Sequence, residues 1–123
     1  HLVSPTELKL PSAVKRYIKE KNLNYYQYTD LEEVIPNVDA CYMTRIQRER
    51  FADPMEFERV KNSYVLTREM VDTSKDNFKV LHPLPRVNEI SEDVDSSPKA
   101  YYFQQALNGV YIREALLTTI LGV

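Results

Sequence analysis

The sequence is poor in the residues that many binding motifs require. Its 123 residues include two glycines, Gly109 and Gly122, one cysteine and no tryptophan. A glycine-rich phosphate loop needs several glycines within one turn, so this class of nucleotide site is excluded. The histidines are His1 and His82, and together with the single Cys41 they cannot assemble a disulfide framework or a paired zinc site. We therefore expect no metal and no cofactor.

The charges are nearly balanced, with 16 basic and 18 acidic side chains and a formal net charge of −2. This balance offers no general attraction to nucleic acid or to an anionic membrane, so we expect neither as a partner. No apolar run approaches the roughly 20 residues that span a bilayer, and no signal peptide is visible. One unpaired cysteine suits a reducing compartment and predicts a cytoplasmic location. Because the sequence begins with His1 rather than Met, we interpret it as a segment of a longer chain.

Short strands and helices alternate along the sequence. Runs of β-forming residues predict strands at 2–3, 25–28, 38–44 and 79–81. Apolar spacing predicts a helix that Ser12 caps and Asn22 ends, and Thr29 with Glu32 indicates a capping box for a short helix that ends before Pro36. Residues 53–74 are charged and mixed, which favours a loop followed by two short helices. This alternation predicts an α/β fold with parallel strands joined by crossover helices.

The most regular segment is the predicted C-terminal helix at 99–121. Its apolar residues cover well over half of the circumference, so the helix has to be covered from more than one direction. One side carries Phe103, Leu107, Val110, Leu117 and Leu121. Arg113 projects into the middle of the apolar arc, and we expect it to have an anionic or carbonyl partner. Part of the covering surface therefore lies outside this sequence.

The first candidate site follows the strand at 38–44. Ligands of open parallel sheets gather at the carboxyl ends of strands, and there Arg45 and Gln47 point to the same side of an extended chain. A guanidinium beside a carboxamide suits a small carboxylate. The alternative interpretations are a solvated corner with surface charges, and a nucleic-acid contact by Arg45, Arg48 and Arg50 that the neighbouring acids disfavour.

The second candidate site follows the last strand and reads His82-Pro83-Leu84-Pro85-Arg86. The two prolines remove two N–H donors and leave the carbonyls of Pro83 and Leu84 without a ladder partner. A cis Leu84–Pro85 bond would aim these carbonyls outward, where they can hold an –NH2 group. The alternative is a rigid loop after a strand. His82 fits a structural hydrogen-bond partner better than a general base, because no nucleophile and orienting partner accompany it.

Four motifs follow one another along nearly the whole chain. They are YMTRIQRERF at 42–51, VLHPLPRVNEI at 80–90, DVD at 93–95, and YFQQA at 102–106 with Asn108, Gly109 and Arg113. In this order and at this spacing they closely resemble the aspartate-binding half of the aspartate carbamoyltransferase family.

The resemblance implies a reaction. The family transfers the carbamoyl group of carbamoyl phosphate to the amine of L-aspartate, giving N-carbamoyl-L-aspartate and phosphate, in pyrimidine synthesis. By this resemblance Arg45 and Gln47 bind an aspartate carboxylate. The carbonyls of Pro83 and Leu84 accept hydrogen bonds from the carbamoyl –NH2, with Leu84–Pro85 cis, and no cofactor or metal takes part. The residues expected to support the site, or to change their contacts when two domains close, are Arg50, Glu56, Pro85 and Arg86.

The ornithine carbamoyltransferase family is the main alternative assignment. It is similar at the carbamoyl edge but carries His-Cys-Leu-Pro there, whereas this chain has Pro83 in place of that cysteine. Arg45 with Gln47 suits a dicarboxylate better than a cationic substrate, so we expect aspartate. Asn88 stands where several relatives have Asp, which affects only the expected closure contacts.

The resemblance also implies parts that the sequence lacks. The family's first domain, with its Ser-x-Arg-Thr-Arg phosphate motif and catalytic histidine, is absent, as are one strand and one helix of the aspartate-binding domain. Family sites lie between adjacent subunits of a catalytic trimer. We therefore expect residues 1–98 to form an aspartate-binding domain that is incomplete at its N-terminus. Residues 99–123 are expected to form a helix that crosses to the absent carbamoyl-phosphate domain.

The expected fold is thus a three-layer α/β/α domain with a parallel sheet. The isolated 123-residue chain is expected to be inactive, and whether regulatory chains bind stays open. Two other classes of function compete with the enzyme. One is a non-catalytic binding module that kept the motifs, and the other is an interaction protein that presents the apolar face of 99–121.

Overall fold

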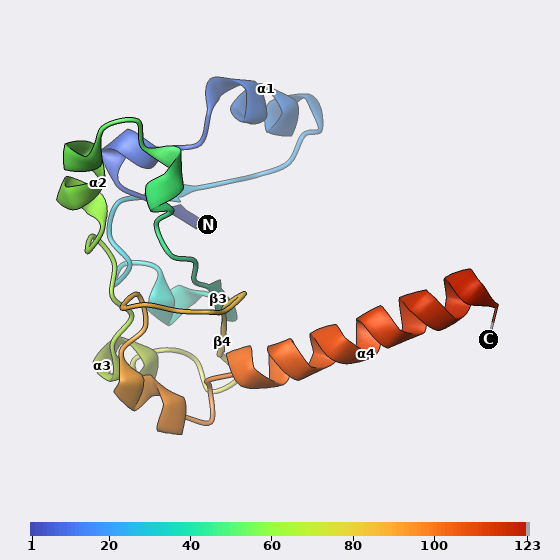
Figure 1. The fold of residues 1–123 in the computed structure, drawn as a ribbon. Helices are drawn as coiled ribbons and strands as arrows, with labels where there is room; N and C mark the ends of the chain where they lie inside the picture. Colours follow the sequence, from blue (N-terminus) through green and yellow to red (C-terminus); the bar gives the residue numbers. More distant parts are fainter. Residues whose placement is uncertain (123) are drawn as a thin grey trace.

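The computed structural model describes residues 1–122 and contains two pairs of parallel strands with helices between them (Figure 1). Strand β1 (Leu2–Val3) pairs with β2 (Gln27–Tyr28), and β3 (Ala40–Tyr42) pairs with β4 (Lys79–Leu81). The connecting helices are α1 (Ser12–Glu20), α2 (Pro54–Val60) and α3 (Arg68–Asp72), and the chain ends in the long α4 (Tyr102–Leu121). Short 3-10 helices occupy Thr6–Leu8, Ile35–Asn37, Arg48–Arg50 and Glu92–Ser96. The predicted α/β class with parallel strands is confirmed.

Strand β4 lies at the centre of the core. Cys41 stands opposite Val80 in the parallel register, and Val80 is completely buried. On the other edge of β4, the Val80 N–H donates to the Lys99 carbonyl at 2.8 Å and the Val80 carbonyl accepts from the Tyr101 N–H at 2.9 Å. The buried side chains packed in the same cluster include Leu66, Val71, Phe78, Ile90, Val94 and Tyr102. Both edges of β4 are therefore satisfied.

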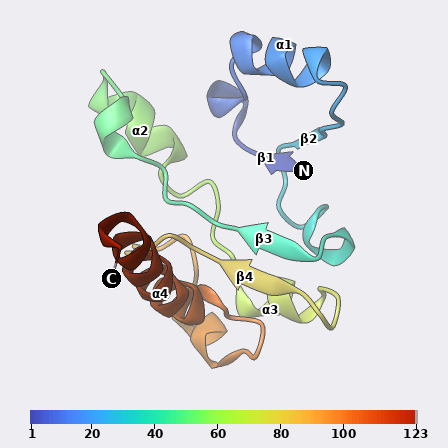
Figure 2. The ribbon, with the colours of Figure 1, turned by 90° about the vertical axis from the view of Figure 1, so that its right-hand side faces the viewer.

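The outer edges of β1 and β3 differ from those of β4. Within residues 1–122, β1 pairs only with β2 and β3 pairs only with β4. The free edges of β1 and β3 face one cavity of about 710 Å³, whose lining includes Val3, Ala40 and Tyr42. Figure 2 shows β1 and β3 as the facing members of the two pairs. Two parallel strands thus expose unpaired backbone groups to the same space.

Two of the predicted helix starts are wrong. Ser12 is the first helical residue of α1 rather than its cap, because Pro11 takes the cap position with no side-chain hydrogen bond. Residues after Thr29 form no capping box, since the Asp30 side chain accepts the Glu32 N–H at 2.9 Å and the following turn is the 3-10 helix Ile35–Asn37. The end of α1 is confirmed, because Asn22 has a positive φ of 53° that a helix cannot continue through.

The two short helices predicted within 53–74 are confirmed as α2 and α3, although α2 begins at Pro54 without a preceding loop. Asp53 caps α2 by accepting the Met55 N–H at 2.8 Å. Thr67 caps α3 by accepting the Met70 N–H at 3.3 Å. Both caps satisfy backbone donors that the first turn leaves free.

Helix α4 extends away from the strands (Figure 1). It begins at Tyr102 rather than at 99, because Ala100 pairs with Val80. Its last helical residue is Leu121, and Gly122 follows with a φ of 69°, a conformation that glycine readily adopts. The expected carbonyl partner of Arg113 is confirmed, since its Nη1 donates to the Gly109 carbonyl at 2.8 Å. Val123, the last residue of the predicted helical segment, lies outside the described residues.

Much of the apolar surface of α4 is exposed. The large apolar side chains exposed on it are Phe103, Leu107, Val110, Tyr111, Ile112, Leu116, Leu117, Ile120 and Leu121. No helix within residues 1–122 combines the length and the apolar character that crossing a membrane requires.

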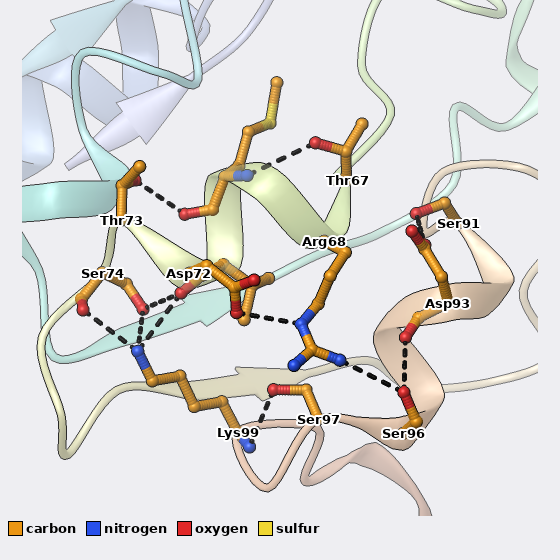
Figure 3. Close-up of polar contacts among 12 residues, drawn as sticks. Thr67, Arg68, Asp72, Thr73, Ser74, Ser91, Asp93, Ser96, Ser97 and Lys99 are labelled. Carbon is orange, nitrogen blue, oxygen red and sulfur yellow. Dashed lines mark hydrogen bonds and ion pairs between the residues drawn. The ribbon is translucent and has the colours of Figure 1, made fainter.

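Polar contacts attach α3 to the segment that leads into α4 (Figure 3). The Lys99 ammonium donates to the Val71 carbonyl at 3.2 Å and to the Ser74 carbonyl and hydroxyl, both at 3.0 Å. It therefore gives a donor to the Ser74 carbonyl, just after α3, and adds a third donor to the Val71 carbonyl, which already accepts the Ser74 N–H and hydroxyl. The Arg68 guanidinium donates to Asp72 at 2.9 Å and to the Ser96 hydroxyl at 3.1 Å. These contacts link α3 to the segment whose Lys99 and Tyr101 backbones bond β4.

We expect Lys99→Met to lower the free energy of unfolding by about 1–3 kcal/mol, because it leaves the partly buried Ser74 carbonyl without a donor. Urea unfolding of wild type and variant measures the difference. The matched control is Lys75→Met, which removes an exposed pair with Asp39 and is expected to change the stability much less. Equal losses in the two variants would contradict the role given to Lys99.

Candidate functional site

The carboxyl ends of β3 and β4 lie side by side. Tyr42 stands opposite Leu81, and the Met43 N–H donates to the Leu81 carbonyl at 2.9 Å. The two segments that carry the predicted site residues, 43–47 and 82–86, therefore leave the sheet at the same edge, the one formed by the carboxyl ends of the strands. This is the edge at which open parallel sheets bind their ligands.

On the first segment, Arg45 forms a two-pronged ion pair with Glu49. Its guanidinium nitrogens lie 2.5 and 3.2 Å from the two carboxylate oxygens. The 3-10 helix Arg48–Arg50 brings Glu49 back toward Arg45, and Gln47 begins this turn by accepting the Arg50 N–H at 3.1 Å. The hydrogen bond and charge of Glu49, and then the charge of Glu89, raise the pKa of Arg45. The guanidinium is thus oriented but still partly exposed.

On the second segment, the buried His82 is the centre of a hydrogen-bond network. It is 2% exposed. Its backbone N–H donates to Gln105 Oε1 at 2.9 Å, and its Nδ1 accepts the Leu84 N–H at 2.8 Å. Its Nε2 lies 2.7 Å from Glu89 Oε1. Because Nδ1 is an acceptor, the ring proton lies on Nε2 and is donated to Glu89. The prediction that His82 is a structural hydrogen-bond partner is confirmed.

Glu89 is buried at 5% exposure and is fully engaged. Its second oxygen accepts the N–H groups of Val87 and Asn88, both at 3.1 Å. Burial alone would raise the pKa of Glu89, but the backbone N–H groups of Glu89 itself and of Val87, followed by His82, outweigh burial and hold the pKa below its usual range. Glu89 is therefore an ionised carboxylate that connects the two segments, because its charge also acts on Arg45.

Arg86 turns toward α4. Its Nη2 lies 2.6 Å from Asp95 Oδ2, its Nη1 also contacts Asp95, and Nη1 donates to the Tyr102 hydroxyl at 3.1 Å. The Tyr102 hydroxyl in turn donates to Asp95. Arg86 lowers the pKa of Asp95, while burial and then Asp95 raise the pKa of Tyr102 to about 12. The Leu84–Pro85 bond between these anchors is cis, as the resemblance implied.

The cavity of about 710 Å³ beside β3 reaches the first segment but not the second. Of the described site residues, Arg45 and Glu89 line it, whereas Gln47, Pro83 and Leu84 do not. Its remaining polar lining includes Arg48 and Asn88. Glu89 lies between the cavity and the His82 network, because it lines the cavity and also accepts a hydrogen bond from the His82 ring.

Two other predicted residues stand apart from these contacts. Arg50 is exposed on the 3-10 helix that carries Glu49, and Glu56 is exposed in the first turn of α2. Within residues 1–122, no group of three or more acidic, histidine or cysteine side chains is placed to hold a metal ion. Burial raises the pKa of the Cys41 thiol to about 11, so it is not poised as a nucleophile.

Residues 1–120 match the family described as the Asp/Orn-binding domain of aspartate/ornithine carbamoyltransferase. The chain belongs to this family. The resemblance seen in the sequence is confirmed.

Relatives across the family cover the whole chain. The aspartate carbamoyltransferase catalytic subunit of Bacteroides fragilis is 57% identical over 124 residues, which is 100% of this chain and 40% of that protein. The Methanopyrus kandleri catalytic subunit is 50% identical over 99% of this chain and 40% of its own length. The chain therefore spans about 40% of the length of these relatives.

Solved carbamoyltransferases share the fold. The catalytic subunit of M. jannaschii aspartate transcarbamoylase has a TM-score of 0.85 at 44% identity, over 98% of this chain and 40% of that one. Aspartate transcarbamoylase from Trypanosoma cruzi, in complex with carbamoyl phosphate and aspartate, has a TM-score of 0.82 at 32% identity, over 94% and 39%. The predicted carbamoyltransferase-like α/β fold is confirmed.

Sequence reasoning missed the partners that hold the carbamoyltransferase motifs in place. Glu49 lies four residues after Arg45, a spacing that favours ion pairs in helical turns and was available as a signal. Glu89, Asp95 and Gln105 stand within the motifs at 80–90, 93–95 and 102–106, but no local spacing rule pairs them with His82 or Arg86.

We expect Asp95→Asn to lower the free energy of unfolding at pH 7 by about 1 kcal/mol, since the pair with Arg86 is only partly buried. The folded pKa of Asp95 is depressed, so its stabilisation is present above the unfolded value of about 4 and is lost as the pH falls toward the folded pKa. The difference between variant and wild type should therefore shrink below about pH 4.

Urea unfolding at a series of pH values from neutral to strongly acidic measures this difference. Asp76→Asn is the matched control, because Asp76 makes no ion pair in the described part of the chain. A constant difference at all pH values would show that the Asp95 charge does not stabilise the fold.

Proposed function

We propose that the protein containing this chain is an aspartate carbamoyltransferase of pyrimidine synthesis, and that the chain supplies the aspartate-binding part of the site. The observation that carries this proposal is the parallel pairing of β3 with β4, which brings the Arg45 segment and the Pro83–Leu84 turn to one edge. The family match and the names of the relatives support it.

Aspartate is favoured over ornithine as the substrate. Glu49 takes one N–H group from each terminal nitrogen of Arg45, the remaining guanidinium N–H groups can donate to a carboxylate, and Gln47 adds an amide. Glu49 holds the Arg45 guanidinium in a defined orientation before a substrate arrives. A cationic ornithine side chain would find no complementary charge in Arg45. The solved Trypanosoma cruzi relative binds carbamoyl phosphate and aspartate, in agreement with this preference.

The reaction joins the two substrates held at this edge. The neutral amine of aspartate attacks the carbonyl carbon of carbamoyl phosphate, a C–N bond forms, the C–O bond to phosphate breaks, and the departing phosphate takes the proton that the amine loses. Carbonyls of Pro83 and Leu84 accept hydrogen bonds from the carbamoyl –NH2 and fix its plane. The chain thus contributes catalysis by positioning, with Arg50, Glu56, Pro85 and Arg86 as supporting residues.

Other parts of the complete protein are proposed to finish the site. A carbamoyl-phosphate domain would supply the phosphate-binding groups and cover the exposed apolar face of α4. One further parallel strand between the free edges of β1 and β3 would join the two strand pairs into one sheet. The catalytic unit would be a homotrimer in the cytoplasm, where the unpaired Cys41 stays reduced.

We expect this chain alone to form no carbamoyl-aspartate, and to form it when a complementary N-terminal half with the phosphate-binding motif is added. Production of carbamoyl-aspartate from carbamoyl phosphate and aspartate is the measurement, with ornithine as the control acceptor. Preferential carbamoylation of ornithine would contradict the proposed substrate. Lack of activity in the complete protein would favour a non-catalytic binding module.

In the complete enzyme, we expect Arg45→Ala to raise the KM for aspartate about 10–100-fold, because charge-assisted hydrogen bonds worth about 1.5–3 kcal/mol are lost. The Kd for carbamoyl phosphate should stay within about threefold of wild type. Steady-state kinetics and isothermal titration measure the two constants. Arg16→Ala, on the exposed surface of α1, is the matched control. Equal rises in the KM for aspartate and in the Kd for carbamoyl phosphate would contradict the role of Arg45.

A further inference from the structure

We propose that His82 is a positioning residue that sets the direction of the Pro83 and Leu84 carbonyls by holding the Leu84 N–H. This inference rests on the proposed carbamoyl transfer, in which those carbonyls receive the substrate –NH2. His82 acts through the turn and does not touch the reacting atoms.

The turn has a single backbone donor with which it can be fixed. Pro83 and Pro85 carry no N–H, so the Leu84 N–H is the only one between His82 and Arg86, and it donates to His82 Nδ1 at 2.8 Å. Leu84 has a φ of 49°, in the left-handed region that non-glycine residues adopt only at an energetic cost. Without the hydrogen bond to the ring, nothing in the turn's own backbone would hold Leu84 in this conformation.

The ring itself is immobilised from two sides. Glu89 accepts from Nε2 at 2.7 Å, which fixes the tautomer that leaves Nδ1 free to accept. Glu89 is held in turn by the Val87 and Asn88 N–H groups. Gln105 on α4 accepts the His82 backbone N–H at 2.9 Å. A ring fixed in this way can transmit its position to the turn.

The same contacts exclude a direct chemical role for His82. Both ring nitrogens are occupied by Leu84 and Glu89, and the residue is 2% exposed. A proton donor or acceptor for the substrate would need a free nitrogen within about 3 Å of it. The imidazole therefore orients acceptors that other atoms provide.

Two variants separate the two ring contacts. In His82→Asn the amide oxygen can take the place of Nδ1 and accept the Leu84 N–H, but the contact with Glu89 is lost. In His82→Gln the longer amide can reach Glu89, but the Leu84 N–H loses its acceptor. Both variants lose one buried hydrogen bond, so we expect similar falls in melting temperature.

Steady-state kinetics of the complete enzyme should separate them. We expect His82→Gln to lower kcat about 10–100-fold, because a small displacement of aligned groups is costly, with the KM for aspartate within about threefold. His82→Asn should retain kcat within about fivefold of wild type. If kcat in both variants falls equally, or simply follows the melting temperature, His82 has only a structural role and the inference is wrong.

A measurement on the wild-type protein covers the case in which the variants do not fold. Nitrogen NMR of the labelled histidines should place the ring proton of His82 on Nε2, and the Leu84 amide should exchange slowly with solvent. A proton on Nδ1, or a rapidly exchanging Leu84 amide, overturns the inference whatever the kinetics show. An inactive wild-type enzyme would instead overturn the proposed function on which the inference rests.

Discussion

The parallel pairing of β3 with β4 decides where the two predicted site segments lie. Because both strands run in the same direction, these segments leave the sheet at one edge, although a pair of helices separates them in sequence. An antiparallel pairing would send them to opposite ends. The pairing depends in turn on the position of β4 in the core: the Val80 side chain is completely buried and its backbone bonds Lys99 and Tyr101, while the backbones of Lys79 and Leu81 bond the β3 side. The core and the site therefore share one strand.

The proline turn is held at both of its ends by charged side chains. At its start His82 binds Glu89, and at its end Arg86 binds Asp95 and Tyr102. Buried charges are costly unless they are paired and hydrogen-bonded, and here every member has a partner. Prolines supply stiffness but no donors, so side chains from outside the turn have to determine its orientation. This division explains why a short segment can present carbonyls in a defined direction.

The sequence was informative where a local rule governed the structure and uninformative where distant contacts did. Strands β1, β3 and β4 followed from short runs of β-forming residues, and the end of α1 followed from Asn22. The start of α4 was misplaced because Ala100 pairs with Val80, a tertiary contact. At the candidate site, residue types at strand ends predicted Arg45 and the proline turn, and the roles of these residues stay predictions. The pairing of the turn with Glu89 and Asp95 was not predicted, because no local spacing rule joins these carboxylates to His82 and Arg86.

Two kinds of unsatisfied surface remain, and they differ in what can cover them. The free edges of β1 and β3 present backbone groups that only an extended segment can pair. The exposed side of α4 presents apolar side chains that require a packed surface. Arg45 and Glu89 line the cavity beside the free edge of β3. A strand that fills this edge would therefore also form a wall next to the guanidinium, so completion of the sheet and shaping of the proposed carboxylate site would be one event.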